Sequence, residues 1–176
     1  MSNINQNANL LKNSQETPIH KIKIMIDFLY LDLTICQRCQ GTETNMDAAL
    51  EDVTKILDTQ GYEIEMKRIH VSSREIATRY EFVSSPTIRV NGQDIDLSQK
   101  ESLCQDCGDL CGDTVDCRVW VYKDEEFTTP PKEMIIDAIL KAAESKLLQF
   151  PMGAVYELPQ NLKVYFDSLD RQQDKL

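Results

Sequence analysis

The strongest hydrophobic pattern of the chain lies between Ile22 and Cys39. Ile22, Ile24, Ile26 and Phe28 recur at every second position, which is the spacing of a β-strand with one apolar face. The other face is also largely apolar, through Met25, Leu29 and Leu31. We therefore predict a strand over residues 21–31 that is covered on both faces.

Later patterns predict a regular alternation of strands and helices. Apolar positions at helical spacing follow from residue 44, and Gly61 is suited to end that helix. The turn Asn91-Gly92 between extended residues indicates a hairpin. Pro130-Pro131 is typical of a helix start. The expected elements after the first strand are a helix from 44 to 60, a strand at 62–69, a helix from a Ser72–Glu75 capping box to 80, strands at 87–90 and 118–122, a short return strand at 126–128, and a helix from 129 to 148.

The 176 residues fit one domain. Residues 1–20 are polar, and we expect them to form a disordered tail. The single domain should cover residues 21–169, with a cysteine-rich insertion at 93–117 and a C-terminal extension at 149–169 that packs on the domain. Residues 170–176 should fray.

Charge and hydropathy exclude some classes of partner. The net charge of -10 argues against a general binder of nucleic acid or of anionic membranes. We find no signal peptide in the polar N-terminal stretch and no run that is apolar enough to span a membrane. We therefore expect a cytoplasmic protein, in which six cysteines indicate catalysis or metal binding before structural disulfides.

The first strand leads into the pair Cys36-Gln37-Arg38-Cys39. A strand, a Cys-x-x-Cys pair and a helix in this order predict a thiol–disulfide redox site that needs no cofactor. Cys36 should attack a protein or small-molecule disulfide, and Cys39 should resolve the mixed disulfide. Arg38 should favour the thiolate by its positive charge, and we also expect it to help bind the partner that carries the disulfide. The alternatives are a pair of inert apolar residues or half of a zinc site.

A second group of cysteines has the spacing C-x2-C-x3-C-x5-C, at Cys104, Cys107, Cys111 and Cys117. Four thiolates could hold zinc, two disulfides could staple the loop, or the thiolates could capture soft ions such as copper(I), mercury or arsenite. The group follows the Asn91-Gly92 turn. We therefore expect it at the end of the sheet opposite the Cys36 pair, unless the insertion folds back.

Residues 21–148 resemble the thioredoxin-like superfamily through Cys36-x-x-Cys39 and through Ser85-Pro86-Thr87 before the third strand. The resemblance implies a three-layer α/β/α fold with a four- or five-stranded mixed sheet. It also implies that Pro86 is cis, and that Ser85 and Pro86 lie against the two cysteines and bind a partner chain. A closer resemblance, to a microbial domain-of-unknown-function family, rests on residues 30–34, 36–41, 104–117 and 130–140.

Four features differ from thioredoxin. The middle dipeptide is Gln37-Arg38, and no tryptophan precedes the first cysteine. Gly41 and Thr44 suggest that the helix begins several residues after Cys36. The buried aspartate of thioredoxins has no clear counterpart, and we interpret Asp27 as an exposed strand residue.

Two main functions therefore compete at this point. One is a thiol–disulfide oxidoreductase that uses Cys36 and Cys39. The other is a binding protein for zinc or another soft metal or metalloid ion. A third hypothesis is an interaction module whose cysteine loop is purely structural.

Overall fold

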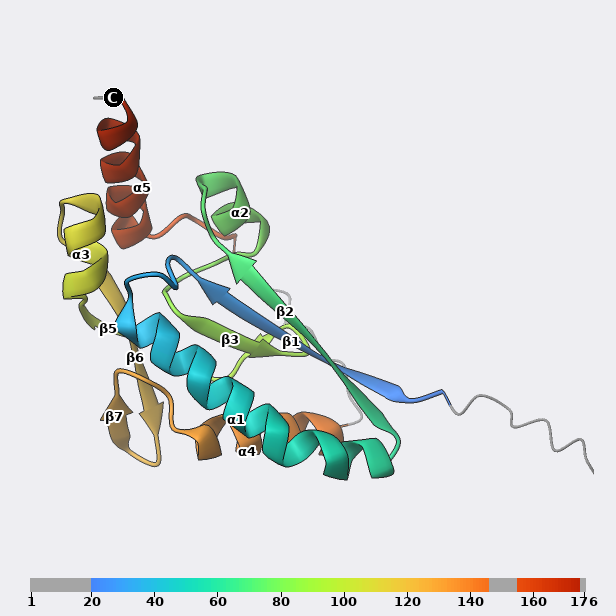
Figure 1. Cartoon of the computed structure of the whole chain (residues 1–176). Helices are drawn as coiled ribbons and strands as arrows, with labels where there is room; N and C mark the ends of the chain where they lie inside the picture. Colours follow the sequence, from blue (N-terminus) through green and yellow to red (C-terminus); the bar gives the residue numbers. More distant parts are fainter. Residues whose placement is uncertain (1–19, 146–154, 175–176) are drawn as a thin grey trace, which may run out of the picture.

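The computed structural model describes residues 20–145 and 155–174 (Figure 1). Our expectations for residues 1–19, 146–154, 175 and 176 lie outside these ranges. The helices and strands are β1 (Ile22–Tyr30), α1 (Gln37–Thr59), β2 (Tyr62–His70), α2 (Arg74–Arg79), β3 (Thr87–Val90), β4 (Gln93–Asp94), β5 (Lys100–Leu103), α3 (Gln105–Cys111), β6 (Asp116–Tyr122), β7 (Glu125–Phe127), α4 (Lys132–Glu144) and α5 (Gln160–Gln173).

The main sheet has four strands in the order β2-β1-β3-β4. β1 is parallel to β2 and antiparallel to β3, and β3 is antiparallel to β4, so the sheet is mixed as predicted. Asn91 and Gly92 join β3 to β4, and both have positive φ angles, which explains why this pair of residues forms the turn. The Asn91 side chain also accepts a hydrogen bond from the Met25 amide at 2.9 Å, which fixes the turn against β1.

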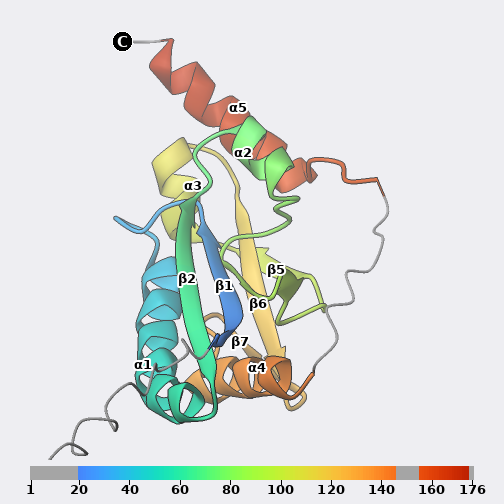
Figure 2. The same cartoon turned by 90° about the vertical axis from the view of Figure 1, so that its right-hand side faces the viewer.

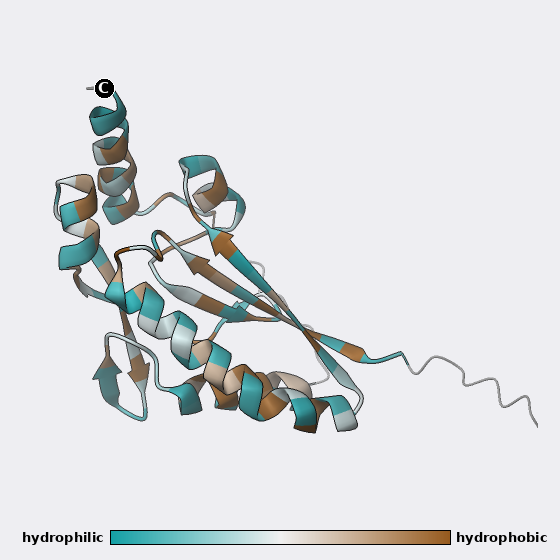
Figure 3. Cartoon of the chain, in the orientation of Figure 1, coloured by the Kyte–Doolittle hydropathy of each residue, from teal (hydrophilic) through white to brown (hydrophobic). Residues whose placement is uncertain are grey.

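Helices α1 and α4 cover one face of this sheet (Figure 2). Their apolar faces pack on the buried side chains of Ile24, Ile26 and Phe28, which point to the same side of β1. Brown hydrophobic and teal hydrophilic positions alternate along both α1 and β1 in Figure 3. This burial of aliphatic and aromatic side chains is the main core of the domain.

Among residues 20–145 and 155–174, α2 and the segment that follows it cover one end of the opposite face. Leu29 and Ile69 pack there with Ala77 and Phe82 in a second core, which also contains all six cysteines. The fold is therefore the mixed α/β architecture that the sequence predicts, compatible with a thioredoxin-like arrangement, with a short third layer.

A second sheet has the order β5-β6-β7, and the cysteine-rich insertion supplies β5 and the start of β6. Its central strand β6 is tied to the main sheet by Arg118. The Arg118 amide donates to the Ser85 carbonyl at 2.7 Å, and its guanidinium makes two hydrogen bonds to the Asp94 carboxylate, at 2.7 and 2.8 Å. Arg118 is only 1% exposed and lies over the ring of Trp120, with 5.0 Å to the ring centroid. A buried ion pair therefore links the two sheets.

Three helix starts differ from the predictions, and one of them is α4, which begins at Lys132 rather than at residue 129. Helix α1 begins at Gln37 rather than several residues later, so the prediction from Gly41 and Thr44 was wrong. The Thr44 hydroxyl donates to a carbonyl one turn earlier, which lets threonine continue the helix. Gly41 is needed because a Cβ there would lie 2.9 Å from the Thr129 hydroxyl oxygen. The capping residue of α2 is Ser73, one residue after the serine of the predicted capping box.

Helix α5 packs against α3 at the cysteine end of the domain (Figure 1). Gln172 donates to the carbonyls of Leu110 and Cys111, at 3.3 and 2.6 Å. The helix runs to Gln173, beyond Asp170, where the sequence predicts fraying. Among the helices of residues 20–145 and 155–174, each is too short or too polar to cross a bilayer.

We predict that the Asp94→Asn variant is less stable than the wild type by about 3 kcal/mol, because it leaves the buried Arg118 guanidinium without the carboxylate that balances its charge. Urea unfolding followed by the fluorescence of Trp120, the one tryptophan of the chain, measures this change. The matched control is Glu126→Gln, which removes an exposed ion pair with Lys100 and should leave stability nearly unchanged. Equal stabilities of the two variants would contradict the role given to Asp94.

Candidate metal and thiol site

Cys36 lies at the junction between the loop that follows β1 and the start of helix α1. It is the N-cap residue of α1, and its Sγ atom accepts a hydrogen bond from the Cys39 amide at 3.4 Å. The loop before it is shaped by Asp32, whose carboxylate accepts from the amides of Thr34 and Ile35, at 2.6 and 2.8 Å. The Cys36 sulfur therefore faces the amide end of a long helix, where a negative charge is stabilised.

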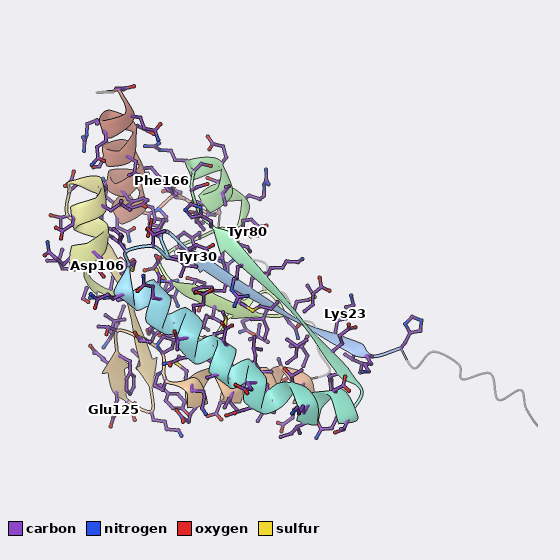
Figure 4. The ribbon with its side chains drawn as sticks, in the orientation of Figure 1. Lys23, Tyr30, Tyr80, Asp106, Glu125 and Phe166 are labelled. Carbon is purple, nitrogen blue, oxygen red and sulfur yellow. The ribbon has the colours of Figure 1, made fainter. Side chains whose placement is uncertain are left out.

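The cysteine-rich insertion folds back toward Cys36. From the position of the turn after β3 we expected it at the opposite end of the sheet from the Cys36 pair, and folding back was the exception that the sequence left open. After β4, strand β5 pairs antiparallel with β6 and returns the chain to the first turn of α1. Helix α3 then lies beside that turn, where the Asp106 side chain accepts a hydrogen bond from the Gln37 amide at 2.8 Å (Figure 4). Pairing with β6 thus brings together thiols that are far apart in the sequence.

Four sulfur atoms meet at this place. Those of Cys36, Cys104, Cys107 and Cys117 all lie within 4.8 Å of one another, and we call them the four-sulfur group. The Cys107 and Cys117 sulfurs are 3.5 Å apart. Cys36 comes from the start of α1, Cys104 and Cys107 from the start of α3, and Cys117 from β6. All six cysteines of the chain are free thiols.

The four-sulfur group differs from the metal set that the sequence suggests. Spacing alone selects Cys104, Cys107, Cys111 and Cys117. In the structure Cys111 lies outside the group, at the end of α3, where its thiol faces the Gly108 and Asp113 carbonyls at 3.9 Å. Cys36, which the sequence assigns to redox chemistry, takes its place.

Arg38 holds the two parts of the site together. Its guanidinium donates to four backbone carbonyls of β5 and β6: those of Leu103 at 2.8 Å, Cys117 at 3.2 Å, Ser102 at 3.3 Å and Arg118 at 3.4 Å. The planar fork of arginine suits such simultaneous contacts. Arg38 therefore fixes the start of α1 against the strands that lead to Cys104 and Cys117. We expected this side chain to bind a partner, but its donors are directed at the protein's own backbone.

Cys39 lies beside the four-sulfur group and contacts the loop before β3. The Ser85 hydroxyl oxygen is 3.4 Å from the Cys39 sulfur, and it accepts a hydrogen bond from the Leu31 amide at 3.1 Å. The Ser85–Pro86 peptide bond is cis, as the resemblance implies. Ser85 thus lies against the Cys36-x-x-Cys39 turn.

The site is closed to solvent. Cys36 and Cys39 are 0% exposed, and both belong to the second core together with Tyr165 and Phe166 of α5. Burial raises the pKa of the Tyr165 hydroxyl. A partner protein would therefore not reach the sulfur atom of Cys36 or of Cys39 on the folded domain.

Hydrogen bonds among the thiols shift the pKa values of the accepting and the donating cysteines in opposite directions. Donation by Cys104, and then by Cys107 and Cys117, holds the pKa of Cys36 below its usual range. Donation from Cys107 lowers the pKa of Cys104 to about 7. The pKa values of the two donors shift upward. Donation to Cys104 raises the pKa of both Cys107 and Cys117.

Sequence reasoning missed two residues that shape the site. Arg118 alternates with Trp120 along β6, so a buried charge could have been inferred from the strand pattern. Asp106 gives no such signal, because its contact with α1 depends on the folded-back insertion.

We predict that Arg38→Ala lowers the free energy of unfolding by about 2 kcal/mol, because the carbonyls around the four-sulfur group lose their charged donor. Arg38→Lys should restore only part of this loss, since one ammonium group cannot reach all four carbonyls. Urea unfolding measures both, and Arg171→Ala is the control because that side chain is mostly exposed. Full restoration of the free energy of unfolding by lysine would contradict the role given to the four hydrogen bonds of the Arg38 guanidinium.

Comparison with known proteins identifies the family. A family model described as "Domain of unknown function (DUF2703)" matches residues 24–139, a range that contains the four-sulfur group and Cys39 but not α5. Searches of curated proteins and of solved structures found no match. Because the model covers well over half of the chain, the protein belongs to the DUF2703 family of domains of unknown function.

Proposed function

We propose that the protein binds a thiophilic metal ion through the thiolates of Cys36, Cys104, Cys107 and Cys117. The observation that carries this proposal is the meeting of four buried sulfur atoms within 4.8 Å, from three separate elements. The chemical class is a soft or borderline ion, such as zinc, copper(I), mercury or arsenite, because thiolates select these ions over hard cations.

The spacing of the sulfurs suits tetrahedral coordination. With zinc–sulfur bonds of about 2.3 Å, ideal tetrahedral geometry puts the sulfurs about 3.8 Å from one another. The 3.5 Å between Cys107 and Cys117 and the 4.8 Å limit for the whole group are close to this value. Small side-chain rotations would therefore be enough to form the complete site.

The surroundings of the group support a resident ion. A divalent cation would neutralise half of the charge of four thiolates, and the amide end of α1 faces Cys36. A reducing compartment such as the cytoplasm, which keeps thiols free, is part of this proposal. The proposal includes no nucleic-acid or membrane partner.

A second candidate function is thiol–disulfide exchange at Cys36 and Cys39. The observation in its favour is the position of Cys36 at the N-terminus of α1 with Cys39 one turn on, next to Ser85. The complete burial of both sulfurs opposes it, because an attacking thiolate must reach its disulfide. We therefore rank metal binding first.

We predict that reduced wild-type protein binds one zinc or cobalt(II) ion per chain. The cobalt form should show the absorption of tetrahedral thiolate coordination, because four sulfurs surround the ion. Cys36→Ser should lower the affinity by about tenfold or more, because it removes one ligand. Equilibrium titration against a competing chelator measures both affinities.

Cys111→Ser is the matched control for this measurement. Cys111 is as buried as Cys104 but lies outside the four-sulfur group, so the variant should keep the wild-type affinity. A wild type that binds no metal would refute the proposed function. Loss of binding in Cys111→Ser with retention in Cys36→Ser would assign the ion to the spacing-based set instead.

For the second candidate, we expect the wild type to accelerate the dithiothreitol-driven reduction of insulin very little, because neither sulfur is exposed. The turbidity of precipitating insulin chains reports the rate. Rapid reduction that disappears in Cys36→Ser would favour exchange as the function.

A further inference from the structure

The site contains a fifth sulfur atom that metal binding does not use. Cys39 is not part of the four-sulfur group, but it lies one helical turn from Cys36 and its amide donates to the Cys36 sulfur. Cys36 is thus both a member of the group and the neighbour of a free thiol. Cys104, Cys107 and Cys117 are the other three members.

We infer that Cys39 is the resolving thiol of a peroxide-sensitive switch, which releases the metal ion reversibly by forming a disulfide with Cys36. This inference rests on the proposed metal-binding function and adds its regulation. The disulfide would remove one of four ligands, and the remaining three would hold the ion more weakly.

The reaction has two steps. The Cys36 thiolate attacks hydrogen peroxide: a sulfur–oxygen bond forms, the oxygen–oxygen bond breaks, and hydroxide leaves. The Cys39 thiol then attacks the sulfenic sulfur of Cys36: a disulfide forms, the sulfur–oxygen bond breaks, and the hydroxyl group leaves as water with the Cys39 proton. Sulfur loses two electrons in total and the peroxide gains two. A dithiol reductant reverses the change.

The burial of the pair selects the class of oxidant. Cys36 and Cys39 are both 0% exposed, so a large disulfide cannot align with either sulfur. Hydrogen peroxide is close to water in size, and small openings of the fold would be enough to admit it. The oxidant class is therefore a small hydroperoxide.

The geometry also singles out Cys39 as the resolving thiol. The other neighbours of Cys36 are members of the four-sulfur group, which the ion would hold. Cys111 faces the carbonyls of Gly108 and Asp113 at the far end of α3. The Ser85 hydroxyl, 3.4 Å from the Cys39 sulfur, keeps that thiol in a polar contact beside Cys36.

The test uses the full chain in its reduced form, loaded with one equivalent of zinc. Hydrogen peroxide is added, released zinc is followed with a colour-forming chelator, and disulfides are mapped by mass spectrometry. Dithiothreitol is then added, and the zinc-binding capacity is measured again. Cys39→Ser and Cys39→Ala are compared with the control Cys111→Ser, after each has been shown to bind zinc and to give the wild-type fluorescence of the buried Trp120.

We expect the wild type and Cys111→Ser to release zinc, to form the Cys36–Cys39 disulfide and to recover their capacity after reduction. Both Cys39 variants should permanently lose about half or more of their zinc-binding capacity. The reason is that an unresolved sulfenic acid on Cys36 oxidises further to the sulfinic acid, which dithiothreitol does not reduce. Oxidised glutathione at the same concentration should release zinc more slowly than peroxide.

Three results would overturn the inference: full recovery of both Cys39 variants, a mapped disulfide that lacks Cys39, or release by oxidised glutathione as fast as by peroxide. In these cases the proposed metal-binding function stands, because zinc was bound before the oxidant was added. A reduced wild type that takes up no zinc would instead refute both.

Discussion

The side chain of Arg38 joins the two parts of the chain that supply the four sulfur atoms. It projects from the first turn of α1, next to Cys36, and donates to carbonyls on both β5 and β6. Those strands lead directly to Cys104 and Cys117. Since buried carbonyls need donors, this network fixes the register of the insertion against α1 as well as its position. The geometry of the four-sulfur group depends on this contact.

Burial of the site then restricts its chemistry. The same packing that brings the sulfurs together, including Tyr165 and Phe166 of α5, removes Cys36 and Cys39 from solvent. A surface dithiol exchanges electrons with large partners, whereas a buried set of thiols can hold an ion and admit only small molecules. The proposed metal site and the proposed peroxide response therefore share one cause, the closed second core. They also explain why the Cys36-x-x-Cys39 pair lies beside Cys104, Cys107 and Cys117, the other three members of the four-sulfur group.

Local signals in the sequence predicted the local structure well. Alternating apolar residues predicted β1, and Asn91-Gly92 predicted the turn after β3. The start of α1 was missed, because Gly41 looks like a loop residue until its close approach to Thr129 is known. The four-sulfur group could not be derived either. Its membership depends on long-range pairing of β5 with β6, and sequence spacing carries no information about which distant thiol replaces Cys111.

The most direct test is X-ray absorption at the zinc edge, on zinc-loaded Cys111→Ser protein. We predict four sulfur ligands at about 2.3 Å, because Cys36 completes the site without Cys111. Three sulfurs with an oxygen or nitrogen ligand in the fourth position would contradict the account. That result would show that the ion depends on Cys111 and that the insertion does not close on the start of α1.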